Sequence, residues 1–128
     1  MRFVYRHLTV LGNESLRAAE ASECASDQGK FWQYHDILFQ NWAGENAGAF
    51  SDSNLKAFAV KIGLDAAPFG TCLDSKRYVD RVREDMAVAR SQGAASTPTV
   101  FVNGRMLAGL ADYQTYKRVI DEALGKAR

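Results

Sequence analysis

The stretch "STPTVFVNGR", residues 96–105, contains the features that decide the fold. Residues 100–102 are a short run of β-branched and aromatic side chains. Asn103 and Gly104 follow directly, and both tolerate the positive φ angles that a two-residue type I′ turn requires, so the stretch predicts a β-hairpin. Pro98 has no N–H to donate and therefore belongs at the first position of a strand. The residues alone favour a trans bond before Pro98, since only about 5% of X-Pro bonds are cis.

Apolar periodicity around this hairpin predicts one further strand and a series of helices. Residues 2–8 alternate as a strand does, with Phe3, Tyr5 and His7 on one face. Asn13 is a capping residue that would open the first helix, and several of the helices end at a glycine. Helices are expected over residues 13–29, 30–42, 48–63, 75–93 and 112–128, and one or two helical turns over residues 64–75. This order predicts an α/β or α+β domain in which helices cover a small sheet.

Three of the predicted helices carry an apolar stripe at helical spacing, which we expect to face inward. The stripes are Leu55, Phe58, Ala59 and Ile62; Tyr78, Val82, Met86 and Ala89; and Tyr113, Tyr116, Ile120 and Leu124. An aromatic group in the second helix is expected to form core and the wall of a groove: Phe31, Trp32, Tyr34, Phe39 and Trp42. The charged run over residues 76–85 is expected to be a solvated face.

Length and composition exclude several classes of function. The 128 residues suffice for one domain with a core, and the net charge of +1 comes from interspersed signs, so a nucleic-acid partner is not expected. The apolar runs are too short for a membrane span. No signal peptide is visible, because Met1 leads directly into "RFVYRHL". The sequence contains no zinc-site spacing, and we expect neither a metal nor a cofactor.

The two cysteines and two histidines leave alternatives open. Cys24 and Cys72 could be free buried thiols, a redox pair or a structural disulfide, and the residues alone do not decide. His35, among aromatic residues, is expected to have a packing or capping role. His7, at the end of the predicted strand, is expected to face solvent. Neither histidine has a nucleophile at motif spacing, so no catalytic triad is predicted.

The hairpin sequence "TPTVFVNGR", after a long helix ending at Gly93 and before a last helix, resembles the C-terminal half of a DsbA-like thioredoxin-fold protein. Residues 2–39 resemble the second strand of that family and the start of its helical insertion. The resemblance covers essentially the whole chain. It implies one truncated thioredoxin-like domain over residues 1–128, with a three-strand sheet, a helical insertion over about residues 13–93 and a C-terminal helix.

The resemblance also implies roles for two pairs of residues. In the family, the bond that matches Thr97-Pro98 is cis, and the residue at Thr97 presents backbone groups to a bound protein or peptide substrate as an added strand does. Cys24 and Cys72 match positions that form a structural disulfide in some members. A loop of this length would contribute roughly 3–4 kcal/mol. Such a disulfide favours an oxidising, extracytoplasmic compartment.

The chain departs from the family at the catalytic motif. The family's chemistry uses a Cys-x-x-Cys motif at a helix N-terminus, where the thiol pKa is lowered. No Cys-x-x-Cys occurs in this sequence, and the resemblance begins at the strand that follows the catalytic helix. We therefore expect thiol:disulfide oxidoreductase chemistry of the family, with no turnover by this chain alone. A redox-inactive peptide-binding module and a glutathione-dependent transferase or isomerase are the alternatives.

The same departure bears on assembly. Without the family's central strand, the strand over residues 2–8 and the strand after Pro98 would each have an open edge. Open edges recruit other strands, and an uncovered sheet face exposes apolar surface. We therefore expect a homo-oligomer.

Overall fold

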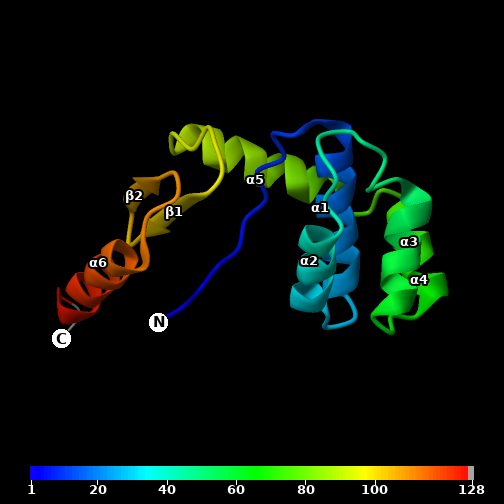
Figure 1. Cartoon of the computed structure of the whole chain (residues 1–128), viewed down its shortest axis with the longest axis horizontal. Coiled ribbons are helices and arrows are strands. Elements are labelled where there is room, and N and C mark those ends of the chain that lie inside the picture. The colour runs from blue at the N-terminus through cyan, green and yellow to red at the C-terminus, as the bar shows by residue number, and fades with distance from the viewer. Residues whose placement is uncertain (127–128) are drawn as a thin grey trace.

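Residues 1–126, which the computed structural model describes, form six helices and two strands. In chain order these are α1 (Gly12–Ser26), α2 (Phe31–Gln40), α3 (Asp52–Lys61), α4 (Ala66–Asp74), α5 (Val79–Ser91), β1 (Thr99–Val102), β2 (Arg105–Ala108) and α6 (Tyr113–Lys126). Helices α1 to α4 pack together as one helical lobe, and α5 runs from this lobe toward the hairpin and α6 (Figure 1). All six helical segments predicted from the sequence are present.

The core of the molecule lies in the helical lobe. Its largest fully buried side chains include Tyr34 of α2, Leu55 of α3 and Phe69 of α4. The hydroxyl of Tyr34 donates to the backbone oxygen of Leu55 at 2.9 Å, which satisfies the polar end of the buried ring. Burial raises the pKa of Tyr34 above its ordinary value. The predicted stripe of α3 faces this core, with Leu55 and Ala59 buried and Phe58 and Ile62 packed against them.

The predicted disulfide between Cys24 of α1 and Cys72 of α4 is present, with an S–S distance of 2.03 Å. Each cysteine is 1% exposed. The bond joins helices whose cysteines are 48 positions apart in the sequence. It therefore restrains a long loop in the unfolded chain and holds α4 against α1 in the folded chain.

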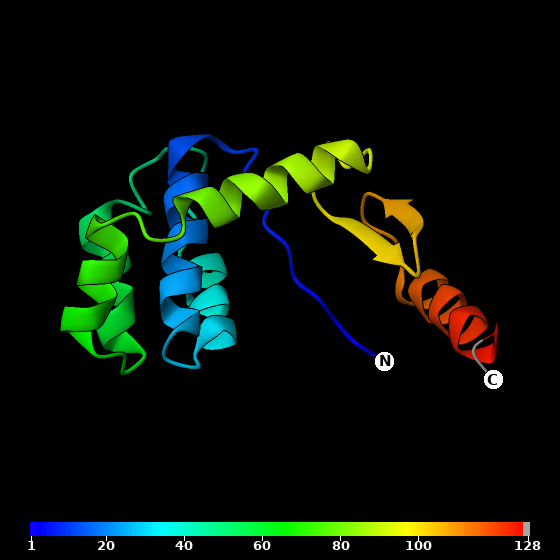
Figure 2. The ribbon, with the colours of Figure 1, turned by 180° about the vertical axis from the view of Figure 1, so that it is seen from behind.

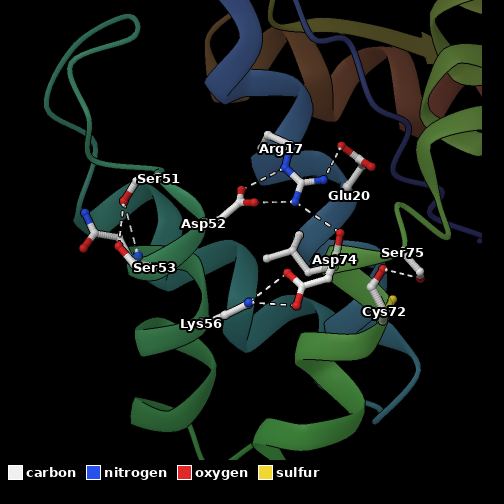
Figure 3. A network of polar contacts seen from close by, with 11 residues as sticks. Arg17, Glu20, Ser51, Asp52, Ser53, Lys56, Cys72, Asp74 and Ser75 are labelled. Carbon is white, nitrogen blue, oxygen red and sulfur yellow. Dashed lines mark hydrogen bonds and ion pairs between the residues drawn. The ribbon is translucent and has the colours of Figure 1, made fainter.

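A half-buried guanidinium joins three helices of the lobe (Figure 3). Arg17 of α1 donates to both carboxylate oxygens of Asp52 at 2.9 Å, to Glu20 Oε2 at 3.1 Å and to the backbone oxygen of Leu73 at 3.1 Å. These bonds link α1 with α3 and with α4. Pairing with Arg17 lowers the pKa of the Asp52 carboxyl, and pairing with Asp52 raises the pKa of Arg17. The Glu20 side chain is only 2% exposed, and Arg17 is its ion-pair partner.

The start of α1 differs from the sequence prediction. The helix begins at Gly12, and the residue before it, Leu11, gives no side-chain cap. Asn46, from the connection between α2 and α3, instead accepts the backbone N–H of Glu14 through its Oδ1 at 3.2 Å. The Asn46 amide lies where a Cβ on residue 12 would be, and Gly12 has a φ of +81°, so this position requires glycine. Asn13 is therefore inside the helix and does not cap it.

The predicted strand over residues 2–8 is not formed, and the sheet has two strands, not three. Residues 1–10 run without regular secondary structure along the helices. The reason is that β1 pairs with β2 alone, so residues 2–8 have no neighbouring strand in the described part of the chain. Contacts with side chains of the helices hold this segment, and they replace the backbone hydrogen bonds that a neighbouring strand would make.

The hairpin forms as the sequence predicts. Strands β1 and β2 are antiparallel, with Val102 opposite Arg105. Asn103 and Gly104 have φ angles of 48° and 84°, as a type I′ turn requires. The hairpin and α6 form a second body at the far end of α5 (Figure 2), and α6 packs on β1.

The inward face of α6 was predicted partly wrongly. Val119 is its buried residue, at 2% exposure, whereas Tyr113 is 73% exposed and Leu124 is 40% exposed. Tyr116 and Ile120 are half-buried, as expected. A two-strand hairpin is too small to cover both ends of a helix of this length. The predicted extension of this helix to residue 128 lies outside the described residues.

Several apolar side chains are exposed, among them Phe3 at 72% and Val4 at 51%. Exposed apolar surface of this kind is consistent with association. The homo-oligomer expected from the sequence stays a prediction.

Replacing both cysteines, as Cys24→Ala with Cys72→Ala, should lower the free energy of unfolding by about 3–4 kcal/mol, because the long loop of the unfolded chain is released. The measurement is urea unfolding followed by circular dichroism. The reduced native chain serves as the control and should unfold at a similarly lowered midpoint. A double variant as stable as the oxidised native chain would show that the bond does not stabilise the lobe.

Arg17→Met should lower the free energy of unfolding by about 3 kcal/mol, because it leaves the buried Glu20 carboxylate without its partner. Lys56→Met is the matched control, since it breaks the exposed pair of Lys56 with Asp74 and should cost less than about 1 kcal/mol. Adding Glu20→Gln to Arg17→Met should recover part of the loss. Equal effects of Arg17→Met and Lys56→Met in urea unfolding would contradict this account.

Candidate peptide-binding site

Thr97 and Pro98 lie at the end of the connection from α5 to β1, and both are exposed. The peptide bond between them is cis, as the resemblance implies. Helix α5 ends in a turn at Gly93, whose φ is +82°, and the N–H of the buried Ala94 returns to the backbone oxygen of Ala89 at 2.9 Å. This turn sets the direction in which the chain enters β1.

Among the described residues, no strand pairs with the outer edge of β1. The N–H of Gly109 donates to the backbone oxygen of Pro98 at 2.9 Å, so Pro98 stands at a position that faces β2. Because hydrogen-bonded positions alternate along an antiparallel pair, the backbone groups of Thr99 and Phe101 point away from β2. The N–H that Pro98 lacks would have faced β2. The outer edge of β1 therefore keeps its backbone N–H donors. The exposed edge can accept an extended peptide as an added strand.

The N-terminal segment crosses the helices through buried polar contacts. Asp85 of α5, at 6% exposure, accepts the backbone N–H of His7 at 3.0 Å and a bond from Arg6 at 3.2 Å. His7 Nε2 lies 2.8 Å from Glu23 Oε1 of α1. Farther along, the N–H of Thr9 contacts Met86 Sδ at 2.9 Å. These contacts place residues 6–9 against α1 and α5.

The prediction that His7 faces solvent is wrong, since His7 is 6% exposed. The missing strand neighbour explains the difference. Without a sheet to define two faces, the segment turns His7 toward the carboxylate of Glu23 on α1. Asp85 also corrects the expectation of a wholly solvated charged run over residues 76–85.

Aromatic side chains secure the start of the segment. The Tyr5 ring lies within 6 Å, centroid to centroid, of the rings of Phe31, Trp32 and His35. Burial raises the pKa of Tyr5. His35 packs in this group, as predicted, and its Nδ1 lies 3.0 Å from Asp36. The predicted aromatic core is correct for Tyr34, which is fully buried, but Trp32, Phe39 and Trp42 are about half exposed or more.

Two shallow depressions follow one side of α5 and share Met86 and Arg90, and we name them together the α5 groove. The first has a volume of about 340 Å³ and is also lined by Thr9, Gly12, Asn13, Leu16 and Arg83. The second has a volume of about 350 Å³ and is also lined by Leu8, Val10, Gly93, Ala94 and Ala95. The second depression thus reaches the connection that leads to Thr97 and Pro98.

The chemistry that the chain itself can supply is limited. Both cysteines are in the buried disulfide, and there is no free cysteine. Within residues 1–126, no cluster of three or more metal-ligating side chains occurs. None of the described helices combines the length and the apolar character that a membrane crossing needs. The site therefore offers backbone hydrogen bonds, apolar contacts and positive charge.

Sequence reasoning missed Asp85, Glu23 and Arg17 because nothing in their neighbouring residues marks the distant partners that they bind. A signal for the α5 groove does exist. Arg83, Met86 and Arg90 stand at i, i+3 and i+7, which places them on one face of a helix.

Comparisons with known proteins agree with the fold. The Na(+)/H(+) antiporter NhaA of Herminiimonas arsenicoxydans is 38% identical over 121 residues, which cover 94% of this chain and 18% of that protein. The Na(+)/H(+) antiporter NhaA 1 of Salinispora arenicola is 33% identical over 130 residues, covering 100% of this chain and 19% of that protein. The chain thus spans about a fifth of the length of these curated relatives. No solved structure gives a significant match.

The family model described as Thioredoxin matches residues 1–122, nearly the whole chain. The match includes the hairpin with its exposed Thr97 and Pro98 and the helices that precede it. The chain therefore belongs to the Thioredoxin family and is a thioredoxin-like domain.

Proposed function

We propose that the chain is the peptide-binding part of a DsbA-like thiol:disulfide oxidoreductase domain. The observation that carries this proposal is the exposure of Thr97 and Pro98 at the head of β1. The substrate is a protein or peptide segment in extended conformation. Its backbone pairs with the backbone groups of Thr97, beside Pro98, as in strand addition.

The disulfide exchange needs a second component that this sequence does not contain. In the DsbA-like reaction, a substrate thiolate attacks one sulfur of a Cys-x-x-Cys disulfide, and the other sulfur leaves as a thiolate. A second substrate thiolate then breaks the mixed disulfide, so the substrate gains a disulfide and the Cys-x-x-Cys pair is reduced by two electrons. The role of this chain is to hold the substrate strand in place. The Cys24–Cys72 bond, with both residues 1% exposed, has a structural role.

A redox-inactive binding module is the second candidate. It is favoured by the absence of a free cysteine in the chain. In a longer protein of the kind that the relatives' names describe, such a module would accompany a sodium/proton antiporter and bind a peptide segment beside it. The disulfide supports an oxidising, extracytoplasmic compartment for either form of the domain.

The isolated chain should give no turnover in insulin reduction or in oxidation of a dithiol peptide, because it has no activated thiolate at a helix N-terminus. The measured rate should equal the rate of dithiothreitol or glutathione alone. A double Cys24→Ala and Cys72→Ala variant is the control and should give the same background. Turnover that this double variant abolishes would show that the buried disulfide is a redox centre.

Strand addition predicts a phase-dependent effect of backbone methylation. Short peptides that bind the chain are prepared with N-methyl groups on alternate residues, in the odd or in the even phase. One phase removes the N–H group that faces Thr97 and should weaken binding about fivefold, since one hydrogen bond is lost. The other phase should bind nearly as the parent peptide does. Fluorescence anisotropy measures both, and equal affinities of the two phases would exclude strand addition at β1.

A further inference from the structure

The α5 groove is lined by positive charge, which is greatest in the first depression. Arg83 and Arg90 both line the first depression, and no Asp or Glu lines either depression. The nearest acidic partner of Arg83 is Asp80, at 3.8 Å and with a side chain 94% exposed. Arg90 forms no ion pair within the described part of the chain. Their charges are therefore available to a ligand in the groove.

The two arginines are placed so that one ligand group can meet both. They are seven residues apart on α5, which is two helical turns, or about 10 Å along the axis. Arginine side chains are long and flexible, and both line the first depression together with Met86. A guanidinium presents several N–H donors in one plane and is suited to a carboxylate.

The helix ends decide which depression suits an anion. Gly12 and Asn13, at the start of α1, line the first depression, so the positive end of the α1 dipole adds to the field of the arginines. The second depression lies at the residues that follow α5, where the negative end of a helix disfavours an anion. Apart from Arg90, its lining is apolar or small. An acidic group therefore fits the first depression and an apolar group fits the second.

The groove leads to the proposed strand-addition edge. Ala95 lines the second depression and precedes Thr97 by two residues, which span at most about 7 Å. An extended peptide rises about 3.3 Å per residue, so a few residues connect the two places. A peptide paired with β1 can therefore continue past Ala95 and into the α5 groove.

We infer that the α5 groove selects peptide substrates that carry an acidic residue a few positions from the segment paired with β1, with Arg83 and Arg90 as the residues that determine this specificity. An apolar residue between them occupies the second depression, against Leu8 and Val10. This inference rests on the proposed peptide-binding function and adds the class of substrate: acidic, extended peptide segments.

The test compares matched peptides in fluorescence anisotropy at low salt. One labelled peptide of apolar residues carries two adjacent Glu, and its partner carries Gln at the same two positions. The native chain should bind the Glu peptide about fivefold more tightly, a size expected for two partly exposed ion pairs. The preference should vanish in about 1 M salt, where the Debye length falls to about 3 Å.

Variants distinguish the effect of the α5 groove on peptide preference from the effect of the chain's net charge. Arg83→Gln and Arg90→Gln should each reduce the preference for the Glu peptide while binding the Gln peptide as the native chain does. Lys61→Gln, which removes one exposed positive charge on α3, is the matched control and should keep the full preference. The double reversal of Arg83→Glu with Arg90→Glu should prefer a peptide with Lys at the same positions. Circular dichroism verifies that each variant is folded.

The outcomes distinguish this inference from the function on which it rests. If the native chain binds the Glu and Gln peptides equally, peptide binding stands and the acidic specificity is wrong. A preference lost equally in Lys61→Gln would also overturn it, because net charge would then be the cause. If neither peptide binds, the proposed function fails together with the inference.

Discussion

Every peptide group in a strand needs a partner, and this requirement shapes both ends of the molecule. Strand β1 satisfies one side through β2 and leaves the other side open. Residues 2–8 alternate as a strand does but have no neighbouring strand in the described chain, so they depend on side chains of α1, α2 and α5. Asp85 is central here, because its buried carboxylate takes the backbone N–H of His7 in place of a strand carbonyl. The open edge of β1 and the attachment of residues 2–8 to helix side chains both follow from the lack of a neighbouring strand.

The helical lobe can present these edges because it is held together independently of the sheet. The Cys24–Cys72 bond joins α1 to α4, and Arg17 joins α1 to α3 and α4. Neither element depends on the hairpin, which contacts none of the first five helices in the described chain. Helix α5 alone connects the lobe to the hairpin, and its side with Arg83 and Arg90 faces outward into the α5 groove. Helix α5, which connects the lobe to the hairpin, is thus also the surface to which we assign the specificity of peptide binding.

Membership of the Thioredoxin family does not by itself assign disulfide exchange to this chain, because function depends on the site and not on the fold. The described site has backbone donors, apolar contacts and guanidinium groups, and its two sulfurs are bonded to each other out of contact with solvent. Such a site is suited to holding an extended peptide. Disulfide exchange requires a thiolate that this chain does not supply. The relatives named as sodium/proton antiporters are about five times longer than this chain, so the sequence it resembles occurs there beside much other protein.

The sequence by itself determined the features that depend on neighbouring residues. Asn103 and Gly104 specify the turn of the hairpin, apolar periodicity locates the six helices, and the missing N–H places Pro98 at the head of β1. Resemblance to a family, and not spacing, supplied the Cys24–Cys72 pairing. Only the tertiary structure decided the long-range partners: Asn46 capping α1, Arg17 bonding to Asp52, Asp85 and Glu23 enclosing His7, and Val119 as the inward residue of α6. The physical reason is that local conformation follows from a few adjacent side chains, whereas the burial and pairing of a polar group depend on which distant element packs against it.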